Sequence, residues 1–278
     1  MFKISINKPS IFHGILFKSV AIISLVFIIS ACSDATQTTE DNTTLTPLNT
    51  LTAEEQQAGW ELLFDGKSLS GWRGLGRDEI PEGHWVVEDN AIKKVASDNV
   101  ERAADGQPIG GGDILYDRKF GNYELQFEWK VSSAGNSGIK YNVSEELSTA
   151  SEPQYAALGF EYQVLDNDLH PDADNDPNRL AAGLYDLIQP GSYAELNPVG
   201  SWNTGRIVFN GNRGEHWLNG TLAVEYELGT YMMDRLLQTS KYGNNDVFGI
   251  RRNSGYIVLQ DHGDDVWFRN IKVRELNP

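Results

Sequence analysis

Two side chains that can exchange protons lie in strand-like segments, each beside a glutamine on the same face. Glu161 and Gln163 are two residues apart in one segment, and Gln260 and His262 are two residues apart in another. Residues two apart in a strand project from the same face. A carboxylate and an imidazole on one face can exchange protons near neutral pH. We therefore predict that Glu161 and His262 are catalytic and that both glutamines bind substrate; the alternative is an ordinary solvent-facing sheet.

A third catalytic candidate, His170, lies in the polar loop that follows the Glu161 segment. Loops at the rim of a sheet often carry catalysis, so His170 could be a mobile acid or base. The alternative is a histidine of the surface. Which of the two histidines, His262 or His170, moves the proton stays open.

Three more polar residues are predicted to contact substrate. Asn136 begins the sequence Asn-Ser-Gly, which we interpret as a tight turn with or without a substrate contact. Arg206 could contact substrate or pair with Glu161, and a structural ion pair within the sheet is the alternative. Glu128 lies on the polar face of segment 123–131, where an exposed strand residue is the alternative.

A divalent metal is a further possibility, with Glu161 and His262 as ligands and a third ligand from another strand. The loop around Asp172 has aspartates at alternate positions but lacks the glycine and glutamate of an EF-hand calcium loop, so a dedicated calcium site is not favoured there. No glycine-rich phosphate loop or nucleophilic serine elbow occurs. We expect no organic cofactor.

The elements that carry these residues are strands. Segment 123–131 alternates strictly between apolar and polar residues, and Asn219-Gly220 reads as the turn of a hairpin. Helices are expected only at 52–58, 178–187 and around 232–239. Many strands separated by turns predict an all-β sandwich of two antiparallel sheets.

The tryptophans and one further histidine divide between core and surface. Trp129 and Trp217 are expected in the core, whereas Trp72 and Trp85 could stack on a ligand. His216 is expected to be structural.

The first residues have the character of a secretory signal. Residues 1–31 have three lysines, no acid and an apolar stretch too short to span a membrane. Ile-Ser-Ala before Cys32, the one cysteine of the chain, resembles the lipobox of bacterial lipoproteins. We predict a lipid on Cys32, a disordered tether over 32–57 and a single domain over 58–278. Ser33 after Cys32 resembles the pattern of outer-membrane sorting, so the membrane is a partner only through the lipid anchor.

The charge balance excludes one class of partner. The formal charge is −16, and without residues 1–31 it is −19, from 20 basic and 39 acidic residues. Nucleic acid is not an expected partner, because phosphate binding needs a basic surface.

Several short motifs occur in the order of a known family. They are Gly59-Trp60-Glu61-Leu62-Leu63-Phe64-Asp65-Gly66, Asn136-Ser137-Gly138-Ile139, Phe160-Glu161-Tyr162-Gln163-Val164-Leu165-Asp166-Asn167, Gly183-Leu184-Tyr185, Trp202-Asn203, His216-Trp217-Leu218-Asn219-Gly220 and Leu259-Gln260-Asp261-His262-Gly263. Their set, from 59 to 273, resembles the bacterial 3-keto-disaccharide hydrolase domain. The resemblance implies a concanavalin-like jelly roll whose concave sheet binds sugar.

The resemblance also implies a reaction. A hydrolase or lyase of this family would act on 3-keto-glycosides, either by hydrolysis or by removal of the C2 proton, elimination and hydration, with carbohydrate as its substrate. The alternatives are a non-catalytic carbohydrate-binding module and a structural envelope lipoprotein.

Overall fold

The computed structural model describes residues 47–97, 112–150, 156–245 and 248–277. They belong to one compact unit, Leu45–Pro278. The predicted signal peptide and Cys32 lie outside the described residues. No helix in the described ranges is both long and apolar enough to cross a bilayer.

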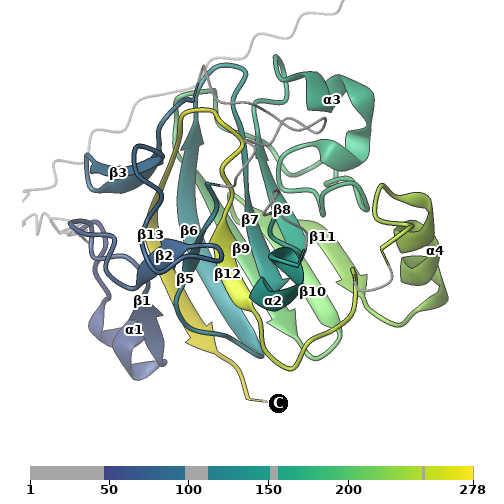
Figure 1. Ribbon diagram of the computed structural model, residues 1–278, viewed down its shortest axis with the longest axis horizontal. Coiled ribbons are helices and arrows are strands. Elements are labelled where there is room, and N and C mark those ends of the chain that lie inside the picture. Colours follow the sequence, from purple (N-terminus) through teal and green to yellow (C-terminus); the bar gives the residue numbers. More distant parts are fainter. Residues whose placement is uncertain (1–46, 98–111, 151–155, 246–247, 278) are drawn as a thin grey trace, which may run out of the picture. The chain divides into compact units, whose positions relative to one another are not determined.

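The fold is a sandwich of two antiparallel sheets, as predicted (Figure 1). In spatial order, the larger sheet contains β11 (Thr221–Glu227), β10 (Arg213–Leu218), β9 (Asn203–Asn210), β6 (Tyr123–Val131), β13 (Val266–Glu275), β4 (Ala91–Lys94) and β3 (Trp85–Glu88), with β1 (Trp60–Leu62) also paired to β13. The smaller sheet contains β2 (Trp72–Gly74), β5 (Ile114–Tyr116), β12 (Tyr256–Leu259), β7 (Asn136–Val143) and β8 (Phe160–Leu165).

The helices are short and lie around the sheets rather than between them (Figure 1). They are α1 (Ala53–Gln57), α2 (Glu145–Ser148), α3 (Pro171–Asn175), the 3-10 helix η1 (Pro177–Arg179) and α4 (Tyr231–Thr239). The helix expected over 178–187 is limited to η1. Its remaining residues turn back, because Leu184 bridges to Tyr162 and to Ile188 and thereby joins the sheet.

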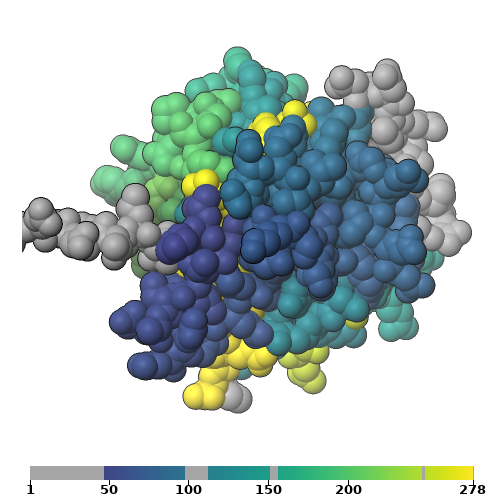
Figure 2. Space-filling view, turned by 90° about the vertical axis from the view of Figure 1, so that its left-hand side faces the viewer, coloured from purple at the N-terminus to yellow at the C-terminus, as the bar shows by residue number. Residues whose placement is uncertain are grey.

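The folded unit begins before residue 58, where the predicted tether was expected to end. Asn49 is buried and exchanges two hydrogen bonds with Asn270, from each backbone N–H to the other's amide oxygen (2.6 and 2.8 Å). Thr52 caps α1 in a reciprocal pair with Glu55. Figure 2 shows residues 47–97, purple to blue, spread over one side of the sandwich.

The alternation of β6 correctly predicts which of its residues enter the core. Tyr123, Leu125, Phe127 and Trp129 are buried between the sheets, where Phe127 packs edge-on against Tyr162 with 5.2 Å between ring centroids.

Three tryptophans differ from their predicted places. The Trp72 and Trp85 indoles are buried and donate to the carbonyls of Leu63 (2.7 Å) and Gly112 (2.5 Å), so neither is a sugar platform. Trp217, expected in the core, lies partly exposed on the outer face of β10, because the alternation turns its neighbours inward instead.

His216 is one of those inward neighbours and is structural, as predicted. Its ring nitrogens lie 2.7 Å from the Tyr141 hydroxyl and 3.1 Å from the Ala182 carbonyl oxygen. Burial lowers the pKa of His216 to about 4.

Candidate functional site

Three adjacent strands of the smaller sheet carry the site on their outer face. Gly138 of β7 is paired with Gln163 of β8, and Lys140 is paired with Glu161. β12 lies on the other side of β7, and the N–H of Gln260, just after β12, donates to the Gly138 carbonyl (2.9 Å). This register brings polar side chains of three distant segments together. They line one small cavity: Asn136, Glu161, Gln163, Tyr185, Lys241, Gln260 and His262.

Glu161 is held in a buried position over a glycine. Only 4 % of the residue is exposed, and a Cβ at Gly138 would lie 2.3 Å from its Oε1. Gly138 is therefore required for the carboxylate to lie across β7. Asn136 to Gly138 thus form strand, not the tight turn that we expected; the turn lies just before them, where Gly135 donates to Ser132.

Two neighbours set the electrostatics of Glu161. Burial raises the pKa of its carboxyl group, and the charges of Lys140 and Lys241 oppose that rise. The Lys140 ammonium lies 3.8 Å from Glu161 Oε2. With its amide nitrogen facing Glu161, Gln163 donates to Oε1 (3.2 Å) and to the Ser137 carbonyl (3.0 Å).

His170 has a defined tautomer. It is the N-cap of α3, and its Nδ1 accepts the backbone N–H of Asp172 at 3.1 Å. A neutral imidazole that accepts at Nδ1 carries its proton on Nε2. His170 Nε2 lies 3.5 Å from the Asn136 amide nitrogen. An amide nitrogen does not accept a hydrogen bond, so the Nε2–H of His170 is left for a bound molecule.

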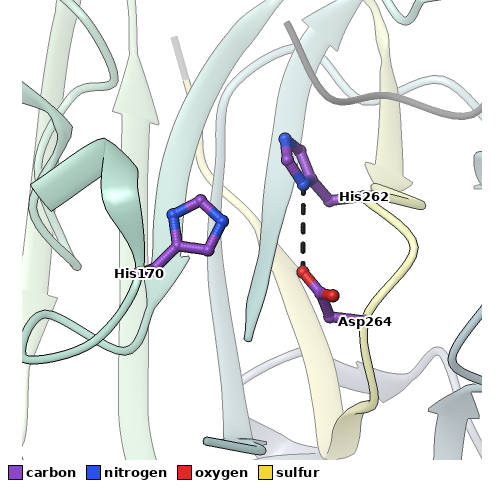
Figure 3. Close-up of side chains that lie close together, drawn as sticks. All are labelled: His170, His262 and Asp264. Atoms are coloured by element: carbon purple, nitrogen blue, oxygen red, sulfur yellow. Dashed lines mark ion pairs between the residues drawn. The ribbon is translucent and has the colours of Figure 1, made fainter. Parts of the chain in front are cut away.

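His262 faces His170 across the site. Their rings are edge-on, with 5.7 Å between centroids, and the Nδ1 of His262 lies 3.9 Å from Asp264 Oδ2 (Figure 3). The same Asp264 oxygen accepts the backbone N–H of Asn136 (3.1 Å). A carboxylate at this distance stabilises a protonated His262.

A buried charge cluster fixes the loop that carries His262. The Asp261 carboxylate pairs with the Lys94 ammonium (3.0 Å) and His84 Nδ1 (2.5 Å), and it accepts the N–H of Gly263 (2.9 Å). Lys94 is fully buried in β4 of the larger sheet. The cluster thus ties this loop to the opposite sheet.

Asp113 also holds the loop that carries His262. It accepts the backbone N–H of Asp261 at 2.8 Å, and burial raises its pKa to about 6.

Two amide oxygens in the site are prepared for a ligand. Asn136 Oδ1 and Gln260 Oε1 are buried and have no hydrogen-bond partner among the described residues. Buried polar atoms are almost always satisfied by protein or water. Both oxygens would accept hydrogen bonds from hydroxyl groups of a bound molecule.

The cavity is closed in this conformation. Its volume is about 10 Å³, room for roughly one water molecule. Tyr185 and Lys241 border it, and the Lys241 ammonium lies 4.5 Å from the centre of the Tyr185 ring. A sugar ring does not fit this volume, so side chains that line the cavity must move before a sugar can enter.

Arg206 and Glu128 do not belong to this site. They lie on the outer face of the larger sheet, where Arg206 pairs with Glu124 (3.2 Å) and Glu128 pairs with Arg269 (2.7 Å). Arg206 cannot pair with Glu161, because β9 and β8 belong to different sheets. The alternative, a structural ion pair, is the one that forms. The polar faces of β6 and β8 accordingly point to opposite sides of the sandwich.

Sequence reasoning missed Lys140, Tyr185, Lys241 and Asp264. Lys140 had a detectable signal, because it follows Asn136 and Gly138 at alternate positions on one face of β7. Tyr185 belongs to the family motif Gly183-Leu184-Tyr185, although that motif was not assigned to the site. Lys241 had no signal, since it comes from a turn far along the chain.

The predicted metal ligands do not form one group. Ligand atoms of His170, His262 and Asp264 lie within 4.8 Å of one another, and Glu161 is not among them. A metal-bound histidine normally donates its other ring N–H, whereas His170 accepts at Nδ1 and so holds its proton on Nε2. The group does not fit a metal as it stands, and no step is assigned to one.

Comparison with known proteins decides the family. The sequence model of a family described as the 3-keto-alpha-glucoside-1,2-lyase-like domain matches residues 59–274. This chain belongs to that family. A 3-keto-disaccharide hydrolase of Bacteroides thetaiotaomicron is 42 % identical over 236 residues, which cover 79 % of each protein.

Solved structures agree with this assignment. The crystal structure of a putative glycosyl hydrolase from Parabacteroides distasonis has a TM-score of 0.71 and 27 % identity, covering 83 % of this chain and all of that one. A second putative glycosyl hydrolase of the same organism (TM-score 0.54, 21 % identity, 78 % and 99 % coverage) shares the fold. The predicted jelly roll and the prediction of a glycosidase-like enzyme are confirmed.

Proposed function

We propose that this enzyme cleaves glycosides that carry a ketone at C3, by elimination followed by hydration. The observation that carries the proposal is the buried Glu161 carboxylate, which lies 3.8 Å from the Lys140 ammonium and lines one cavity with two unsatisfied amide oxygens. A C3 ketone makes the C2 proton acidic, so a single well-placed base can begin the cleavage.

Glu161 is the base in this reaction. Its raised pKa makes the carboxylate a stronger base than an exposed glutamate. It takes the proton from C2 and leaves an enolate, whose negative charge is balanced by the nearby Lys140 ammonium. The electron pair of the enolate then expels the oxygen from C1.

His170 protonates the departing oxygen, because its Nε2 carries the proton. The imidazolate that this leaves recovers a proton from the water molecule that enters next. The products of this half-reaction are a free sugar and a 3-keto-sugar with a C1–C2 double bond. Water then adds its hydroxyl to C1 and a proton to C2. We assign the proton that C2 receives to His262, which Asp264 can stabilise in its protonated form. Glu161 then passes the proton that it took to His262, which returns both groups to their starting states.

Amide side chains orient the sugar. Asn136 and Gln260 accept hydrogen bonds from its hydroxyl groups, and Gln163 holds the carboxylate of the base in place. A binding module on this fold needs no buried carboxylate of raised pKa, so the site favours the enzyme over a non-catalytic carbohydrate-binding protein.

The test is to supply the purified protein with a 3-keto-disaccharide and with its unoxidised parent, and to follow sugar release. We expect release from the keto-sugar alone, and a loss of about 10²- to 10⁴-fold in the Glu161→Gln variant. The matched control is Glu225→Gln, an exposed carboxylate of the larger sheet that should retain activity.

Reaction in heavy water separates the two routes. Elimination followed by hydration places deuterium at C2 of the product, whereas direct hydrolysis leaves C2 unlabelled. Sugar release without labelling would refute the proposed mechanism. Release that Glu161→Gln leaves unchanged would refute the assigned base, and loss of activity with a chelator would show that a metal takes part.

A further inference from the structure

The outer face of the larger sheet contains a second, much larger hollow. This groove, which we call the β9 groove, has a volume of about 700 Å³. Ligand pockets for small molecules have volumes of about 300–1,000 Å³. The groove lies on the opposite side of the sandwich from the candidate active site, so one small substrate cannot occupy both.

We propose that the β9 groove is a second carbohydrate site, which binds a neutral saccharide without cleaving it. Its floor comes from alternate residues of two paired strands, Gln126 and Glu128 of β6 and Thr204 and Arg206 of β9. Trp217 of β10 also lines it. The proposal is independent of the reaction assigned to Glu161.

The charges of the groove favour a neutral ligand. Its four charged residues are two acids and two bases, and each has a partner of opposite charge. Glu55 pairs with Lys272, Glu128 with Arg269, and Arg206 with Glu124. In a chain of formal charge −16, this balanced surface offers no net attraction to an anion or a cation.

Trp217 supplies a fixed aromatic surface. The pairing of β10 with β11 shifts its register between His216 and Trp217, and such bulges re-aim side chains. The Arg206 guanidinium lies 4.0 Å from the centre of the indole ring, and the indole N–H donates to Glu215 (2.8 Å). A partly exposed ring held in this way can pack against the C–H face of a sugar at little entropic cost.

Directional polar groups surround this ring. The Arg206 guanidinium makes one hydrogen bond within the described residues, to Glu124, and its other N–H groups remain available. The amide oxygen of Gln126 likewise has no acceptor role within the described part of the chain. Planar donors and acceptors beside an aromatic ring match the alternating C–H and O–H groups of a pyranose.

The test measures binding of neutral, unoxidised di- and trisaccharides of glucose, galactose and mannose, by calorimetry and by saturation-transfer NMR. The protein carries Glu161→Gln, so that its active site is disabled while the groove is unchanged. We expect at least one saccharide to bind, and Trp217→Ala to weaken it about tenfold or more. Trp267→Ala, on the same face but outside the groove, is the matched control and should bind normally.

A second variant guards against a folding defect in Trp217→Ala. Thr204 is exposed on the groove floor, so Thr204→Tyr fills the groove without emptying the core, and it should also reduce binding. Absence of binding to the whole panel overturns the proposal. So does binding that Trp217→Ala and Thr204→Tyr leave unchanged, because the saccharide would then occupy another surface.

Discussion

At the scale of single residues, position rather than residue type sets the chemistry. The chain has many glutamates, but Glu161 is distinguished by its burial over Gly138, which raises its pKa. His170 and His262 are likewise separated by their surroundings: a backbone N–H fixes the tautomer of His170, while a carboxylate lies beside His262. On these contacts we assign the proton of the leaving group to His170.

His170→Asn tests that answer. Asparagine can still cap α3 by accepting the N–H of Asp172, but its amide group cannot give up a proton to a leaving group. We expect its kcat to fall about 10²-fold or more for a 3-keto-disaccharide. It should stay near normal for a 3-keto-glycoside with a nitrophenol leaving group, because that anion departs without protonation. Equal losses on both substrates would contradict the role of His170 as the acid.

At the scale of elements, the turn between β6 and β7 decides on which side of the sandwich the polar side chains of each strand lie. β6 and β7 are consecutive in the chain, but the turn through Gly135 sends them into different sheets. β6 therefore contributes to the β9 groove, whereas β7 carries the candidate active site. His216 of β10, in the larger sheet, faces the core. There it contacts Tyr141 of β7, in the smaller sheet.

His216 predicts acid sensitivity of the fold. Its pKa falls from 6.5 when unfolded to about 4 when folded, so it stabilises the fold above 6.5 and loses this contribution as pH falls through that window. Asp113, whose pKa is raised to about 6, acts in the opposite direction. Between about pH 7 and pH 4, the free energy of unfolding should fall by about 3 kcal/mol more in the wild type than in His216→Gln.

Urea unfolding of both proteins across this range provides the measurement. His216→Gln leaves Asp113 unchanged, so the difference between the two curves isolates the histidine. Parallel curves would show that His216 is not neutral in the folded protein.

At the scale of the whole molecule, the sandwich separates two surfaces. One carries the closed acid–base site on the smaller sheet, and the other carries the open, charge-balanced β9 groove on the larger sheet. An enzyme with a saccharide site behind its active site could stay on a glycan while it acts.

We also propose that the protein is tethered by a lipid on Cys32 at the outer membrane, on the periplasmic or surface side.

The anchor is tested by Cys32→Ser expressed in a bacterium with a lipoprotein pathway. We expect the wild type in the membrane fraction, with an intact mass that includes the lipid, and the variant in the soluble fraction. Ser33→Ala is the control and should remain lipidated. A Cys32→Ser protein that still sediments with membranes would exclude this anchor.

The sequence by itself determined the class of fold, because alternation assigns each strand residue to a face and the apolar faces must be buried. It also determined the family, through short motifs in a fixed order, and it pointed to Glu161, Gln163, Gln260 and His262 on two shared faces. The core place of Trp129 followed from the same alternation.

Only the tertiary structure decided which strands are neighbours. The face of a strand follows from its own sequence, but the sheet that it joins depends on pairing with segments far away, such as Asn136 with the loop of Asp264. This is why Arg206 and Glu128 were placed in the wrong site and Lys241 was missed. The burial and raised pKa of Glu161 and the tautomer of His170 also depend on residues far away in the chain. These properties are what allow the polar face to transfer a proton.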